Sequence, residues 1–233
     1  LDNIALVAGQ QTFNYNVPAG ATPGNTFARV RVSTAGGLLP NGLADDGEVE
    51  DYAVTVRAPA EVVNQQIFYN RSFYDGSTFV AGVVATDGTN DAAAIDTTKT
   101  PLLPGGTATK ANYTSYSRGI NGIFIDVQNL PGPISEADFT FRLGNSNTPQ
   151  NWAAAPPPAS ITVQFGAGLN GSDRIRITWA DNVIQKTWLQ ITLLSTEKTG
   201  LLAANVHYWG NAIGEIGDTP TNAQVTLADI ATI

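Results

Sequence analysis

Residues 173–194 read DRIRITWADNVIQKTWLQITLL and carry two of the clearest strand patterns in the chain. In the first half, Ile175, Ile177 and Trp179 alternate with polar side chains. The second half repeats the alternation, with an apolar face made of Leu189, Ile191 and Leu193. A period of two is the spacing of side chains on a strand that buries one face. The segment therefore predicts two half-buried strands joined by a turn.

The same alternation recurs along most of the chain and decides the expected fold class. Phe139 and Phe141, for example, are predicted to face the same side of one strand. Strands are predicted at 62–69, 79–84, 119–127, 137–143, 160–165, 173–179, 187–194 and 204–209. Turn residues rich in Gly, Pro and Asn separate them, and only the last dozen residues have a helical pattern. We therefore expect an all-β protein with an antiparallel, jelly-roll-like β-sandwich at residues 58–217.

Composition excludes several classes of function. Lys and Arg total 12 and Asp and Glu total 20, so the formal charge is −8, which does not suit a phosphate backbone. The absence of Cys excludes disulfides and thiolate metal sites. No apolar run approaches the ~20 residues of a membrane span. The single histidine, His207, lies in an alternating segment typical of a strand, so we expect no enzyme.

The chain begins at Leu1 and contains no Met, so we expect a piece of a longer protein. Low charge, abundant Thr, Asn and Gly, and no oxidisable Cys or Met suit an exported bacterial protein. The predicted location is extracellular or at the cell surface.

The first part of the chain has its own strand patterns. Strands are predicted at 12–17, 27–32 and 52–56, the last preceded by the acidic run DDGEVED at 45–51. Carboxylates in a Gly-containing turn are potential calcium ligands. The favoured interpretation is a solvated turn, because the oxygen spacing of an EF-hand is absent.

The run ARVRVSTAGGLLPNGLADDGEVEDYAVTV, at 28–56, resembles the C-terminal half of a GEVED domain, and the resemblance extends back to residue 12. It implies a β-sandwich module of large exported or surface bacterial proteins, frequent in planctomycetes. We assign residues 1–57 to this partial module. With few strands, the module leaves an unpaired edge, which could accept a strand from a neighbouring chain.

Two further resemblances concern the rest of the chain. The segments FYNRSFYDG, ANYTSYSRGINGIFIDV, GSDRIRITWADNVIQKTWLQITLL and VHYWGNAIGEIGD look like a module near the C-termini of planctomycete secreted proteins. That resemblance implies an accessory role and no mechanism. Residues 218–233 resemble a degenerate dockerin loop, in which Asp218, Asn222 and Asp229 take ligand positions. Because Pro220 and Ala223 break the motif, a metal-free end or a terminal helix capped near Thr226 is favoured.

One loop region offers oxygen ligands at short spacing. The candidate calcium ligands are Asp75, Asp87, Asn90, Asp91 and Asp96. Calcium prefers such carboxylate and amide oxygens, and ions of this kind fix long loops. The alternative is an Asx-rich loop whose side chains bond their own backbone.

Three aromatic residues are candidates for a polysaccharide site: Trp152, Tyr113 and Tyr116. Sugar C–H faces stack on exposed rings, although rings also fill cores. We expect a non-catalytic structural or adhesive module that assembles with copies of itself or neighbouring domains. The alternative is a carbohydrate-binding module that serves a glycan-degrading enzyme.

Overall fold

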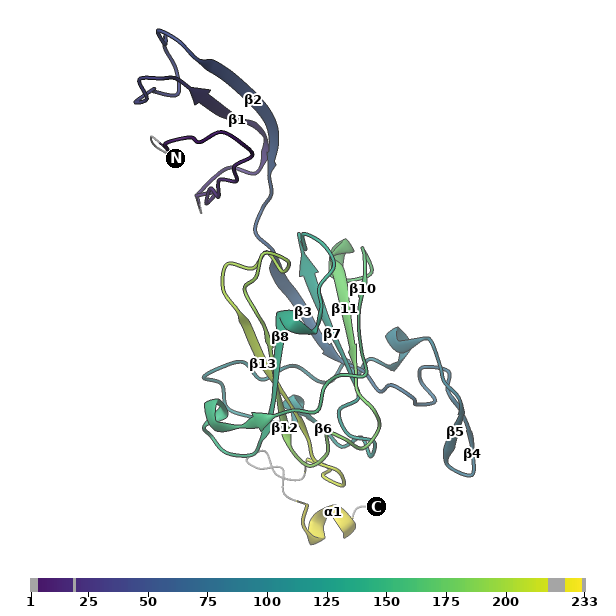
Figure 1. Ribbon diagram of the computed structural model, residues 1–233. Helices are drawn as coiled ribbons and strands as arrows, with labels where there is room; N and C mark the ends of the chain where they lie inside the picture. The colour runs from purple at the N-terminus through teal and green to yellow at the C-terminus, as the bar shows by residue number, and fades with distance from the viewer. Residues whose placement is uncertain (1–3, 19, 218–224, 232–233) are drawn as a thin grey trace. The chain divides into compact units, whose positions relative to one another are not determined.

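The computed structural model describes residues 4–18, 20–217 and 225–231, and it is an all-β structure (Figure 1). The chain divides into two compact units, residues 1–58 and 59–233. The all-β class predicted from the alternation is confirmed. No helix in the described ranges is long and apolar enough to cross a membrane.

The first unit is built on one antiparallel hairpin, β1 (Gly24–Val32) with β2 (Glu48–Val56). The guanidinium of Arg29 contacts the carboxylate of Asp51 across the two strands, with Nε and Oδ1 2.7 Å apart. Residues 12–17, predicted as a strand, form none. Their apolar side chains are exposed, and a strand forms only where a second strand accepts its hydrogen bonds.

The second unit is a sandwich of two sheets (Figure 1). The first sheet has the order β10-β11-β7-β3. Its strands are β3 (Glu61–Ile67), β7 (Gly122–Gln128), β10 (Ser160–Gln164) and β11 (Asp173–Thr178). The second sheet has the order β6-β13-β12-β8-β9. Its strands are β6 (Tyr113–Thr114), β8 (Phe139–Gly144), β9 (Ala153–Ala154), β12 (Trp188–Leu193) and β13 (Asn205–Asn211).

The strand order specifies the sandwich further. When the strands are lettered in chain order, the first sheet has the order A-B-E-D of an immunoglobulin sandwich, with β3 as A, β7 as B, β11 as E and β10 as D. The second sheet has the order G-F-C-C′ of the opposite immunoglobulin sheet, with β13 as G, β12 as F, β8 as C and β9 as C′. All neighbours are antiparallel except β13 and β6, which are parallel. This order describes the fold and implies no particular function.

The core lies between the two sheets and uses the apolar faces that the alternation predicted. Ile175, Ile177 and Trp179 from the first sheet and Leu189, Ile191 and Leu193 from the second are all buried. The rings of Phe139 and Phe141 lie on one side of β8 with centroids 5.4 Å apart, as expected.

The remaining elements are short. The predicted strand 79–84 is instead a hairpin of β4 (Thr78–Val80) and β5 (Val83–Thr86). Its two turn residues, Ala81 and Gly82, have φ of 49° and 79°, the positive values of a tight hairpin turn. The 3₁₀ helices are η1 (Asp91–Ala94), η2 (Lys110–Asn112), η3 (Glu136–Asp138), η4 (Pro149–Asn151) and η5 (Leu169–Gly171).

One α-helix, α1 (Leu227–Ala231), lies in the described part of the C-terminal segment. The hydroxyl of Thr226 accepts a hydrogen bond from the backbone N–H of Ala228, so Thr226 caps the helix as expected. Asp229 accepts hydrogen bonds from the backbone N–H groups of Thr226 and Ile216. The other two dockerin-like positions, Asp218 and Asn222, lie outside the described residues.

Candidate functional site

The connection between β3 and β7 is far longer than the sandwich requires. These strands are neighbours in one sheet, and antiparallel neighbours can be joined by a loop of a few residues. Here residues 68–121 intervene and contain the β4–β5 hairpin, η1, η2 and β6. Long ordered connections on a rigid scaffold commonly carry binding residues. The insertion at residues 68–121 is therefore the candidate functional site.

The insertion presents large apolar side chains to solvent. Phe73 is 76% exposed and Tyr74 71%, and Val80 and Val83 at the tip of the β4–β5 hairpin are each 69% exposed. The rings of Phe73 and Phe79 lie with centroids 4.5 Å apart, which brings the loop and the hairpin together. We call Phe73, Tyr74, Phe79, Val80 and Val83 the aromatic surface. Exposed apolar side chains grouped on one loop and one hairpin are candidates for an interaction site.

The loop that carries Phe73 and Tyr74 is held by Asp75, whose side chain is buried. Its carboxylate accepts hydrogen bonds from the backbone N–H groups of Arg71, Ser72 and Ser77. A Cβ at Gly88 would lie 2.3 Å from the carbonyl oxygen of Asp75, so the following loop packs directly on it. The sequence therefore builds a fixed platform rather than a free loop.

Charged groups surround the aromatic surface in balanced pairs. Arg71 lies 3.4 Å from Asp87, and Arg118 lies 2.6 Å from Asp181. Arg118 also places its guanidinium 5.3 Å from the centroid of the Phe79 ring, a cation–π contact. The two pairs leave the site close to electrically neutral.

Tyr116, a predicted ligand-binding residue, supports this loop from within. Its hydroxyl donates to the carbonyl oxygens of Asn70 and Arg71, at 3.1 and 3.2 Å. Its ring lies 4.7 Å from that of Tyr69. Burial raises the pKa of Tyr116 to about 12, so the hydroxyl keeps its proton and remains a donor. Tyr116 therefore positions the residues that reach solvent.

The other two predicted aromatic ligands are buried, which matches the alternative that these rings fill the core or anchor a loop. Tyr113 is 5% exposed and Trp152 8%. The indole N–H of Trp152 donates to the carbonyl oxygen of Ser146 at 3.0 Å. A Cβ at Gly144 would lie 2.3 Å from the indole ring, so the ring packs flat on the backbone there. Trp152 thus holds its Asn- and Pro-rich loop to the sheet.

Three of the predicted calcium ligands, Asp75, Asp87 and Asn90, lie in the two loops that flank the β4–β5 hairpin. The backbone N–H of Asn90 donates to the carbonyl oxygen of Asp75 at 3.0 Å. Asp87, whose side chain is exposed, contacts Arg71. Their contacts match the alternative in which such side chains and their backbone order the loops that contain them.

The other two, Asp91 and Asp96, are directed to different partners. Asp91 forms an ion pair with Arg176 on β11. Burial raises the pKa of Asp96, but hydrogen bonds from Thr98 and Tyr69 outweigh it, so the pKa lies below its ordinary value. Within the described residues, no group of three or more His, Cys, Asp or Glu side chains could hold a metal ion. Calcium at Asp75, Asp87 and Asn90 stays a prediction, and melting curves with calcium and with chelator check it.

His207 lies in the interior between the two sheets and is fully buried. Its Nδ1 lies 2.8 Å from the side-chain nitrogen of Gln65, which also donates to Asn205 at 2.7 Å. Gln65 belongs to β3 and the other two to β13, so the cluster joins the two sheets. Burial lowers the pKa of His207 to about 3, so the imidazole is neutral at ordinary pH. These contacts are those of a core histidine.

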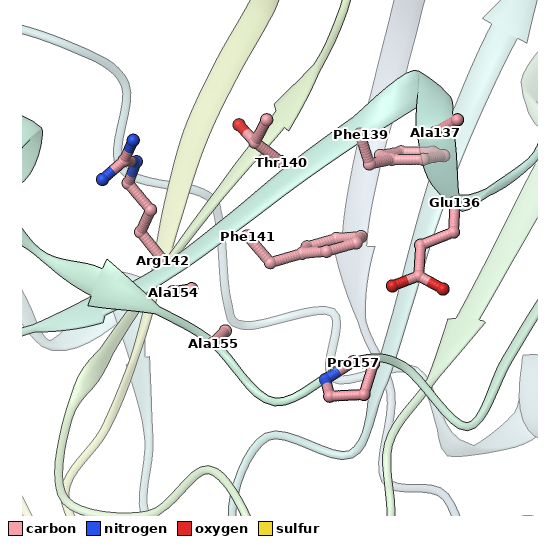
Figure 2. Close-up of a pocket in the computed structure, with 9 residues that line it drawn as sticks. All are labelled: Glu136, Ala137, Phe139, Thr140, Phe141, Arg142, Ala154, Ala155 and Pro157. Carbon is pink, nitrogen blue, oxygen red and sulfur yellow. The ribbon is translucent and has the colours of Figure 1, made fainter.

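A groove with a volume of about 730 Å³ opens beside β8 (Figure 2). Figure 2 shows the Phe139 and Phe141 rings one above the other on one wall, with Pro157 across from them. The groove exists because β9 ends at Ala154, ahead of three successive prolines that cannot continue a hydrogen-bonded ladder. Glu136 and Arg142 are the charged residues of its lining. The groove therefore opens one edge of the hydrophobic core to solvent.

The residues of the aromatic surface were not predicted from the sequence as a site. The predicted site residues in this region were the neighbouring Asp75, Asp87, Asn90 and Tyr116. The available signal was the density of rings in FYNRSFYDGSTFV, at 68–80, where Gly, Ser and Asp indicate loops. Alternation could not separate buried from exposed rings here, because this stretch is not one regular strand.

Comparison with known proteins gives one positive result. The family model of the GEVED domain matches residues 2–55, starting earlier than the resemblance predicted from residue 12. Comparisons with curated proteins and with solved structures found no match. The matched stretch contains β1 and nearly all of β2.

Proposed function

We propose that the chain is a non-catalytic structural or adhesive module of a large bacterial protein that is secreted or displayed at the cell surface. The GEVED match supports the location, because this domain is often found in extracellular proteins. The aromatic surface carries the adhesive role, because a partner that covers it would remove its exposed apolar side chains from water.

The platform beneath the aromatic surface strengthens the proposal. Asp75 and Tyr116 fix the backbone of the loop from two sides. A binding surface that is ordered before contact loses less conformational entropy on association. The insertion therefore has the properties of a prepared contact site.

Adhesion of the purified chain tests the role directly. Beads coated with the chain are expected to bind to cells or cell-wall material, and F73A and Y74A are expected to reduce binding at least tenfold. Both side chains are more than two-thirds exposed, so melting temperatures stay close to that of the parent chain. Y15A removes an exposed ring from the first unit and serves as the matched control. Equal binding by all variants would remove the proposal.

Location needs a separate measurement. Antibodies against residues 59–233 are expected to label intact cells of the source bacterium, and labelling only after permeabilisation would contradict an extracellular module.

We propose a carbohydrate-binding module as the second candidate function, with the aromatic surface as its binding site. Exposed rings beside balanced Arg71–Asp87 and Arg118–Asp181 pairs suit an uncharged polysaccharide, whose C–H faces stack on rings and whose hydroxyls bond the charged groups. Retention on insoluble neutral polysaccharides, lost in Y74A and kept in Y15A, would favour it. Adhesion that soluble polysaccharide does not compete away would favour a protein partner.

A further inference from the structure

Edges of the sandwich differ in how well they are protected against pairing with another chain. Natural sheets protect an edge by short strands, bulges, prolines or charged side chains. In the second sheet, β6 and β9 are two residues each. In the first sheet, β3 begins at Glu61 and its register with β7 shifts between Val62 and Asn64. Each of these three edges has a recognised protection.

The fourth edge, β10, has none of them. It is five residues long, SITVQ, without a charged residue or a proline, and it pairs with β11 in regular register along its whole length. The hairpin of the first unit carries charges on both strands, Arg29 and Arg31 on β1 and Glu48, Glu50 and Asp51 on β2. The β4 and β5 strands are three and four residues long and contain a register shift. Among the described strands, β10 is the regular, uncharged edge.

We infer that β10 is a self-association edge, at which two copies of this chain pair their β10 strands antiparallel about a two-fold axis. A two-fold pair places the same segment opposite itself, so a charged strand would meet its own charge, whereas SITVQ meets only neutral side chains. The inference rests on the structural role in the proposed function and names a surface for the self-assembly expected from the sequence.

The flanking sequence sets the register of this pair. Pro156, Pro157 and Pro158 precede β10 and cannot extend a ladder, and Gly166 after it turns the chain with φ of 68°. The ladder is therefore confined to residues 160–164, and its centre is Thr162. In that register Thr162 faces Thr162 of the second copy, and Ile161 faces the second copy's Val163.

Pairing also completes the burial of apolar side chains at this edge. Ile161 and Val163 are half-buried and pack against the rim of the core. Phe165, next on the same face, is 66% exposed. A second β10 strand would join the two first sheets into one eight-stranded sheet and cover this rim. The contact is small, so we expect a reversible dimer rather than a permanent one.

Thr162→Glu is the primary test. Within one chain, position 162 lies opposite Arg176 on β11, so the new carboxylate faces a cation and the fold is retained. Across the two-fold axis, two carboxylates face each other. The parent chain is expected to approach twice the monomer mass by light scattering as its concentration rises to several hundred micromolar, and T162E is expected to remain monomeric. T140E, on an exposed position of β8, is the matched control that keeps the dimer.

Cross-linking tests the register independently, because the chain has no cysteine. T162C is expected to form a covalent dimer under mild oxidation, since opposed strand residues lie within disulfide reach. T140C is expected not to. A parent chain that stays monomeric, a dimer that T162E leaves intact, or absence of the T162C cross-link would each overturn the inference.

The adhesion assay separates this inference from the proposed function. Y74A is expected to dimerise normally while losing adhesion. A dimer without adhesion overturns the proposed function alone, and adhesion by a strict monomer overturns the β10 inference alone.

Discussion

Gly47 opens the run GEVED at residues 47–51, and its geometry shows at the scale of one residue why a glycine stands there. Its φ is +108°, and a Cβ there would lie 1.7 Å from the carbonyl oxygen of Val32. Any side chain would therefore force β1 and β2 apart where the acidic turn enters β2. Asp51, the last residue of the motif, is fixed by its pair with Arg29.

We predict that Gly47→Ala destabilises the first unit by about 1–3 kcal/mol, because it combines backbone strain with a steric clash. Hydrogen exchange of the β1 and β2 backbone amides at increasing urea concentration measures the change. Gly20→Ala is the matched control, since Gly20 has open space around its Cα and no strained φ. Equal midpoints for the two variants would contradict the close approach at Gly47.

His207 predicts a pH dependence of stability with a definite sign. The pKa of His207 is about 3 in the folded chain, against 6.5 when the side chain is exposed. Above pH 6.5 the imidazole is neutral in both the folded and the unfolded chain, so its titration does not change the free energy of unfolding. Below pH 6.5 the unfolded chain binds a proton that the folded chain excludes. Stability therefore falls by about 1.4 kcal/mol per pH unit toward pH 3.

The measurement is the free energy of unfolding at pH 7 and pH 5. The parent chain is expected to lose about 2 kcal/mol between them. His207→Gln removes the only histidine and is expected to flatten this dependence, whatever its own stability. If the free energy of unfolding of the variant falls between pH 7 and pH 5 as much as that of the parent chain, another group causes the dependence.

At the scale of elements, a buried ion pair joins three strands of the first sheet. Asp126 on β7 accepts hydrogen bonds from Arg174 on β11 at 2.7 and 2.9 Å, from Asn64 on β3 at 3.1 Å, and from the backbone of Leu169 at 3.0 Å. Burial raises the pKa of Asp126, but these hydrogen bonds, with that from Arg174 the largest, hold it below the ordinary value.

We predict that Asp126→Ala lowers the free energy of unfolding by about 3–5 kcal/mol, because it leaves the Arg174 charge buried without its partner. Chemical denaturation at pH 7 measures it. Asp87→Ala removes an exposed carboxylate from a loop and is expected to cost less than about 1 kcal/mol. Similar losses in both variants would show that the Asp126 pair is solvated.

Alternation located the sandwich strands well, and its failures have physical causes. Seven of the eight strands predicted in the second part of the chain are present as single strands at nearly the same bounds. The stretch 79–84 was ambiguous because Ala81 and Gly82 continue its apolar run, while only their positive φ shows the turn. The stretch 12–17 alternates but lacks a partner strand, which no local pattern can reveal.

At the scale of the whole molecule, the two units are predicted to unfold separately. Each has its own contacts, with a boundary at residues 58 and 59. A chain of residues 59–233 is expected to keep the near-UV circular dichroism and melting temperature of the second unit in the full chain. A melting temperature lower by more than about 5 °C would show that the first unit stabilises the second.

The amino-acid sequence by itself determined the all-β class, the faces of most strands and the GEVED-like segment, because these depend on a period of two and on local motifs. The tertiary structure decided the immunoglobulin-type strand order, the burial of Trp152 and Tyr113, and the exposure of Phe73 and Tyr74. Burial depends on which segments meet across the sandwich, and the spacing of residues along one chain does not encode that meeting.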